Sequence, residues 1–208
     1  MTVPGVRHTQ TSDRRPDEPA VRGGRGMDTE LVIRAQRGDQ GAYTLVAGEI
    51  ADRFLAVARR ILRDLDLAED ATQQALIAIW QDLPQLREPA RFEAWAYRLL
   101  VNACYTEGRR QRRWAPNIRL LQAEQPAGGD DLTSVIDRDQ LEAGFRRLPL
   151  DHRAVVVLHH YLDLPLERVA DVLGIPVGTA HSRLHYAMRG LRAALEADAR
   201  PAMREVAR

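Results

Sequence analysis

Hydrophobic residues recur every three or four positions between residues 28 and 195, which is the period of amphipathic α-helices. In the first half this pattern predicts four helices, over about 28–38, 40–62, 67–83 and 93–113. In the second half it predicts a helix over 132–148, another that Asp151 caps, and two short helices within 166–195. The pattern therefore predicts an all-α fold, arranged as two small helical domains joined by a flexible linker.

The last two predicted helices are separated by Gly174, Ile175 and Pro176. Glycine ends helices in the left-handed conformation, and proline is tolerated in the first turn of the next helix. This spacing predicts a helix-turn-helix. The stripes expected to face inward are Leu166, Val169, Ala170 and Leu173 on the first helix, and Val177, Ala180, Leu184, Met188, Leu191 and Leu195 on the second.

The opposite face of the second helix carries hydroxyl and guanidinium groups. Such groups bind phosphates and base edges in the major groove, and the free N–H groups near Gly178 favour phosphate. This face consists of Thr179, Ser182, Arg183, Tyr186 and Arg189. DNA reading is one interpretation; a helical hairpin whose polar face is simply solvated is the other.

The first half has an acidic and a basic cluster. Asp66, Glu69, Asp70, Gln73 and Gln74 gather near the start of one predicted helix, and Arg109, Arg110, Arg112 and Arg113 lie at the end of the next. Each sign suits the helix dipole at that end, so both clusters have a purely structural explanation. The alternatives are a partner-docking surface for the acidic cluster and, with Tyr97, Arg98, Asn102 and Tyr105 exposed beside the arginines, a groove for unpaired bases. Trp80 and Cys104 are expected to be buried.

Composition limits the function classes. The 208 residues carry a net charge of +1 and one cysteine, and contain no apolar run long enough to span a bilayer. No secretory signal, nucleophile–base constellation or nucleotide-binding loop is visible, and the adjacent His159 and His160 cannot chelate together. We expect a cytoplasmic protein that is not an enzyme, uses no metal or cofactor, and holds nucleic acid through local patches.

The predicted organisation has five parts. Residues 1–26 form a disordered tail, with Met27 a possible start; residues 27–113 form the first domain, 114–131 the linker, 132–197 the second domain and 198–208 a C-terminal tail.

Both halves together resemble an extracytoplasmic-function (ECF) sigma factor of the sigma-70 family. The resemblance rests on DLDLAEDATQQALIAIW, RFEAWAYRLLVNACYTEGRRQRR and the segment from Leu148 to Leu195, which contains GTAHSRLHYAMRGLR. It implies a sigma region 2-like domain that docks on core RNA polymerase and melts the minus-ten element. It also implies a region 4-like domain that reads the minus-thirty-five element.

The resemblance assigns roles by position. Asp66, Glu69, Asp70, Gln73 and Gln74 would bind the polymerase clamp helices. The loop from Pro84 to Arg91, with Asn102 and Tyr105, would capture a flipped base, and Arg98, Arg109, Arg110, Arg112 and Arg113 would hold the melted strand. Val177, Gly178, Thr179, His181, Ser182, Arg183, Tyr186 and Arg189 would read duplex DNA.

Some positions depart from the family pattern. Gln74 and Ala75 stand where Glu and Thr are usual, Glu107 stands where Asp is usual, and His181 replaces the usual Lys. Core polymerase (clamp and flap), promoter DNA and an anti-sigma factor are the implied partners. The rival hypotheses are a stand-alone helix-turn-helix regulator and an inactive sigma-like decoy.

Overall fold

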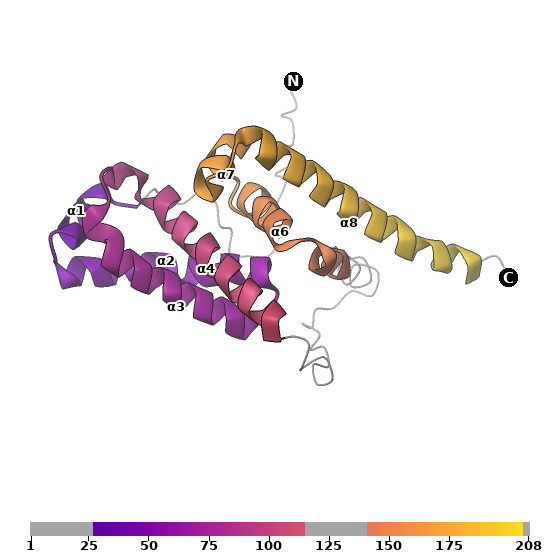
Figure 1. Ribbon diagram of the computed structural model, residues 1–208, viewed down its shortest axis with the longest axis horizontal. Coiled ribbons are helices and arrows are strands. Elements are labelled where there is room, and N and C mark those ends of the chain that lie inside the picture. Colours follow the sequence, from indigo (N-terminus) through magenta and orange to yellow (C-terminus); the bar gives the residue numbers. More distant parts are fainter. Residues whose placement is uncertain (1–26, 115–140, 206–208) are drawn as a thin grey trace, which may run out of the picture.

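The computed structural model describes residues 27–114 and 141–205, and all regular structure within these ranges is helical (Figure 1). The predicted fold class is thereby confirmed. The tail 1–26, residues 115–131 of the predicted linker, and the expected inward residues Val135 and Ile136 lie outside the described ranges. The elements are α1 (Thr29–Gln36), α2 (Gln40–Leu62), α3 (Leu65–Asp82), η1 (Leu83–Gln85), η2 (Pro89–Arg91), α4 (Phe92–Trp114), α6 (Leu150–Val156), η4 (Val157–Tyr161), α7 (Leu166–Leu173) and α8 (Val177–Glu205), and residues 141–147 are also helical.

Aspartate caps set the starts of the first three helices. The Asp28, Asp39 and Asp64 carboxylates each accept a hydrogen bond from a backbone N–H in the first turn that follows. Arg63 takes the left-handed conformation (φ 61°) and ends α2. Helix α2 has the predicted bounds, whereas α3 begins two residues before the predicted Leu67 because Asp64 supplies its cap.

The first lobe, residues 27–114, is built around α2, α3 and α4. Its largest fully buried side chains include Phe54, Phe92 and Leu100, and Phe54 packs on Tyr97 with ring centroids 5.3 Å apart. Full burial of such a side chain contributes about 1.5–3 kcal/mol. These contacts hold the long α4 against α2 and α3, so the polar residues at its end have a fixed position.

The second lobe, residues 141–205, differs in three details from the predicted pattern. Val177, Leu141 and Met188 are 40%, 45% and 43% exposed. The inward stripe of α8 instead follows Ala180, Leu184, Ala187, Leu191 and Ala194, of which Leu184 is partly buried. Alternating steps of four and three keep these positions on one side of a 3.6-residue helix, whereas Val177 and Met188 fall outside that stripe.

The ends of two helices in this lobe also differ from the prediction. The cap of α6 is Pro149, and Asp151 lies inside the first turn without capping it. The Asp151 carboxylate is paired with Arg183 instead. Helix α8 continues to Glu205, past the predicted limit near Leu195.

The two lobes pack against each other. Leu158, Val169 and Val172 of the second lobe are buried in the same hydrophobic cluster as the first-lobe core. The lobes approach closely at Gly108, where an added Cβ would lie 2.6 Å from Leu150 Cδ2. Apolar contacts between α4 and the second lobe therefore hold the two lobes together in this arrangement.

Candidate polymerase and nucleic-acid interfaces

The helix-turn-helix forms as predicted. Gly174 ends α7 with φ 64°, and the N–H of Ile175 donates to the Ala170 carbonyl at 3.1 Å. Helix α8 then starts at Val177, leaving its first turn at the surface. A non-glycine residue is strained at this φ, so the sharp turn depends on Gly174.

Most of the predicted duplex-reading residues are accessible along one side of α8. Val177, Gly178, His181, Ser182, Tyr186 and Arg189 are exposed, and Thr179 is half-buried. Ser182 Oγ donates to the Thr179 carbonyl at 3.0 Å. This side of α8 presents hydroxyl, imidazole and guanidinium groups, which are types that can bond bases and phosphates in a major groove.

Arg183 is the exception among these residues. Its side chain is only 25% exposed, and its Nη2 lies 3.2 Å from Asp151 Oδ2 of α6. In the structure this guanidinium is therefore paired with a carboxylate of its own lobe.

Arg98, predicted to bind the melted strand, contacts the second lobe. Its Nη2 donates to the Asp171 carbonyl at 2.8 Å and its Nε to the Val172 carbonyl at 3.4 Å. These carbonyls belong to the last turn of α7, whose dipole favours a cation. Arg98 thus bridges α4 and the helix-turn-helix.

Tyr97 and Tyr105 are covered, contrary to the prediction that both are exposed. Tyr97 is 7% exposed, and burial raises its pKa. Burial also raises the pKa of Tyr105 to about 12, and its Oη is buried without a hydrogen-bond partner among the described residues. The helical period alone placed both rings on an outer face, but α2 and the second lobe lie against that face.

A cleft of about 220 Å³ lies between α4 and α6. Tyr105, Arg109 and Arg112 line it from the first lobe, and Pro149 and Asp151 line it from the second. The cleft brings three predicted strand-binding residues together at the junction of the lobes.

The arginines at the end of α4 are exposed as predicted. Arg109, Arg112 and Arg113 are all at the surface, and Asn102, earlier on the same helix, is also exposed. Arg110 is also exposed but is held by Asp70 and Glu107, with an N···O distance of 3.0 Å to each. Arg91 makes only a loose surface pair with Glu88 at 3.6 Å, of a kind that contributes little.

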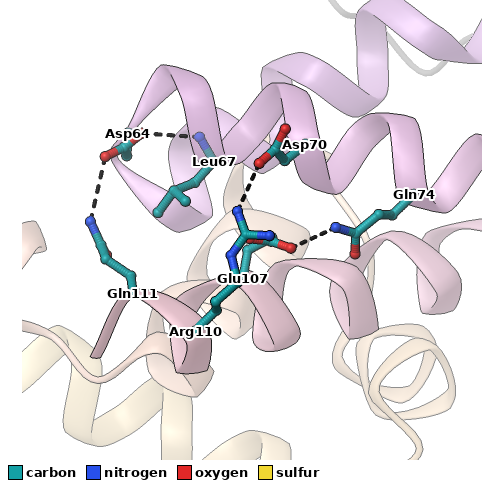
Figure 2. Close-up of polar contacts among 7 residues, drawn as sticks. All are labelled: Asp64, Leu67, Asp70, Gln74, Glu107, Arg110 and Gln111. Carbon is teal, nitrogen blue, oxygen red and sulfur yellow. Dashed lines mark hydrogen bonds and ion pairs between the residues drawn. The ribbon is translucent and has the colours of Figure 1, made fainter. Parts of the chain in front are cut away.

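The predicted polymerase-docking residues divide into two groups. Asp66, Glu69 and Gln73 are exposed on α3, whereas Asp70 and Gln74 turn toward α4 (Figure 2). Gln74 Nε2 donates to Glu107 Oε1 at 2.5 Å. The five residues therefore do not form one free surface.

An apolar groove beside Gln73 was not predicted from the sequence. It has a volume of about 470 Å³ and lies between α2 and α3, lined by Tyr43, Ile77, Trp80 and neighbouring polar residues. Trp80 is 43% exposed, not buried as predicted, and its ring meets Tyr43 edge-on at 4.5 Å. The spacing of Gln73, Ile77 and Trp80 at i, i+4 and i+7 was the available signal, because these positions share one helix face.

Cys104 is fully buried, as predicted. Burial raises the pKa of its thiol to about 12. A thiol in this state is a packing group and not a nucleophile.

Within the part of the chain that the structure describes, none of the helices has the length and apolar character needed to span a membrane.

Two family models match the chain. Sigma-70 region 2 matches residues 48–114, and sigma-70 region 4 matches residues 144–193. The matched segments contain α4 with its arginines, and the helix-turn-helix as far as residue 193 of α8.

Individual proteins extend these matches over most of the chain. It is 30% identical over 191 residues to the RNA polymerase sigma-H factor of Pseudomonas aeruginosa, covering 86% of this chain and 97% of that one. It is 31% identical over 142 residues to the ECF RNA polymerase sigma factor SigL of Mycobacterium tuberculosis, covering 67% and 80%. Among solved structures, CnrH in complex with the cytosolic domain of CnrY has a similar fold, with a TM-score of 0.60, 24% identity, and coverage of 82% of this chain and 98% of that one.

Proposed function

The chain belongs to the ECF group of sigma-70 RNA polymerase sigma factors, and from this premise we propose how its two lobes divide promoter recognition. A sigma factor is a non-enzymatic initiation factor that binds core RNA polymerase and directs it to promoters. Polymerase, duplex DNA and melted DNA must each bind a surface of the two lobes.

The exposed polar side of α8 reads the minus-thirty-five element as duplex DNA. The observation that carries this assignment is the tight turn at Gly174, which leaves the first turns of α8 uncovered. Gly178 and Thr179 offer backbone N–H groups to phosphate at the helix start. His181, Ser182 and Arg183 face the bases, with Tyr186 and Arg189 extending the contact along the groove.

The end of α4 holds the non-template strand after melting. Arg109, Arg112 and Arg113 are free of ion pairs with other described residues, so they are available to phosphates. Unpairing bases costs a few kcal/mol, and a pocket with stacking and phosphate contacts offsets it. Asn102 and Tyr105 are the nearest groups for a captured base, once the second lobe has moved from Tyr105.

The surface of α3 docks on polymerase. Glu69 and Gln73 supply polar contacts, and the groove at Ile77 and Trp80 supplies apolar area that would otherwise remain in water. This combination of a polar rim and an aromatic centre is typical of a protein-binding surface.

An anti-sigma protein is the partner that would cover these surfaces when the chain is inactive. The support is the family itself and the structural similarity to CnrH, which was solved in complex with the cytosolic domain of CnrY. We place the chain in the cytoplasm, where polymerase and promoters are found.

The test combines start-site mapping and reconstitution. Transcription start sites induced by overexpression of the chain define its promoter, and purified chain with host core polymerase should initiate at that promoter. Core polymerase alone is the control and should be inactive there. A chain that binds the same DNA tightly without polymerase, and does not initiate with it, would favour the stand-alone regulator.

A further inference from the structure

Glu107 is the only charged side chain that is fully buried among the residues the structure describes, at 1% exposure. A carboxylate in such a place is costly unless other groups pair with it. Its Oε1 accepts the 2.5 Å hydrogen bond from Gln74 of α3, and its Oε2 lies 3.0 Å from Arg110 Nη2. Oε1 is therefore hydrogen-bonded to α3, whereas Oε2 makes an ion-pair contact with Arg110 and no hydrogen bond to a described residue.

Arg110 has a second carboxylate partner. The same Nη2 donates to Asp70 Oδ2 at 3.0 Å (Figure 2). Asp70 and the Arg110 side chain are 48% and 54% exposed, unlike Glu107. An exposed pair of this kind contributes little to stability, so Asp70 is easily exchanged for another anion.

We propose that Glu107 is a positioning residue that holds Arg110 for the melted promoter strand and ties it to the polymerase-facing helix. The inference rests on the proposed role of α4 in binding that strand. In the free chain Arg110 Nη2 lies between the Glu107 and Asp70 carboxylates; in the promoter complex Glu107 keeps its contact and a phosphate takes the place of Asp70. A guanidinium has five donors in a planar fork, so it bonds a carboxylate and a phosphate together.

The hydrogen bond to Gln74 gives Glu107 a fixed position relative to α3. With a glutamate at position 74, two carboxylates would meet at the 2.5 Å now bridged by the amide. The amide donor at Gln74 therefore suits the carboxylate at Glu107. Glu107 thus contacts both α3, which docks on polymerase, and Arg110, which binds the strand. One buried carboxylate therefore fixes the position of Arg110 relative to α3.

The experiment measures binding of a fluorescent single-stranded oligonucleotide by reconstituted holoenzyme. The oligonucleotide carries the non-template minus-ten segment of the mapped promoter, and polymerase is saturating so that docking is complete. The variants are Glu107→Gln, Arg110→Ala and the double variant. Glu107→Gln retains an oxygen for Gln74 and removes the charge that holds Arg110. Glu93→Gln is the matched control, because Glu93 on the same helix pairs with Arg53 at 3.4 Å, away from the arginine cluster.

Arg110→Ala should weaken binding about tenfold, the usual effect of losing a hydrogen bond to a charged group. Glu107→Gln should weaken it about fivefold on the same reasoning, and should lower the slope of log affinity against log salt by about 0.7, equivalent to one phosphate contact on a single strand. In the Arg110→Ala background, Glu107→Gln should have no further effect. A purely structural role would not change the salt slope.

Two results would overturn the inference: unchanged binding in Glu107→Gln, or losses that multiply in the double variant. If Glu107→Gln does not fold, Gln74→Glu with Glu107→Gln keeps an amide–carboxylate bond between the helices but moves the charge to α3, and should show the same reduced slope. Wild-type holoenzyme that fails to bind the oligonucleotide contradicts the proposed function itself. If the wild-type holoenzyme binds the oligonucleotide and Glu107→Gln binds it equally well, only the positioning role is contradicted.

Discussion

Replacement of Gly108 by leucine should separate the two lobes. Gly108 lies within α4, and an added Cβ would stand 2.6 Å from Leu150 Cδ2 and 3.7 Å from Leu62 Cδ2. The first distance is well inside van der Waals contact, and leucine places three more carbon atoms beyond the Cβ. Since Leu150 belongs to α6, the clash acts between the lobes.

Two opposing effects set the magnitude. Leucine in place of glycine inside a helix stabilises α4 by roughly 0.8 kcal/mol. Overpacking a close interface costs about 1–3 kcal/mol, which lowers the ratio of closed to open chain roughly 5- to 150-fold. The first lobe should therefore remain folded while the second lobe moves away from it.

Small-angle X-ray scattering and hydrogen exchange measure this outcome. The radius of gyration should rise, and amides of α6 and η4 should exchange faster, because Val157 and Leu158 would lose their cover. The matched control is Gly48→Leu, since a Cβ at Gly48 of α2 meets nothing within 4 Å. An unchanged radius of gyration in Gly108→Leu, with the fold intact, would refute the reasoning that these helices meet closely at Gly108.

Three further outcomes are expected. Arg183→Ala should cost about 1–3 kcal/mol of discrimination at one base pair of the minus-thirty-five element in competition binding assays, whereas equal weakening on every sequence would exclude base reading. Joint replacement of Arg109 and Arg110 by alanine should impair transcription from duplex promoters more than from pre-melted templates; equal failure on both would contradict the strand-holding role. Because burial raises the pKa of Cys104 to about 12 from 9.0, the unfolded thiol ionises first, so wild-type stability relative to Cys104→Ala should fall as pH rises from about 9 toward 12 in urea titrations. A constant difference over that range would show that the thiol is not shielded.

The elements of this protein could be predicted from its sequence because their causes are local. Helix α2 has the predicted bounds since Asp39 caps it and its apolar residues repeat with the helical period. Gly174 marks the helix-turn-helix because glycine tolerates a positive φ. The burial of Cys104 and the exposure of the α8 polar side follow from the same periodicity, and the family resemblance rests on these segments.

The relation between the lobes was decided only by tertiary structure. Periodicity says that a face is apolar or polar, but it does not say which distant surface lies against it. Tyr97 and Tyr105 were expected at the surface and are covered, while Trp80 was expected inside and is exposed. Long-range shape complementarity, such as Leu150 over Gly108, placed α6 and α7 on the first lobe. That packing gave Arg98 its carbonyl partners in α7, and the packing of α3 on α4 brought the Asp70 carboxylate to Arg110. These partners are distant in the sequence and meet only when the helices are assembled.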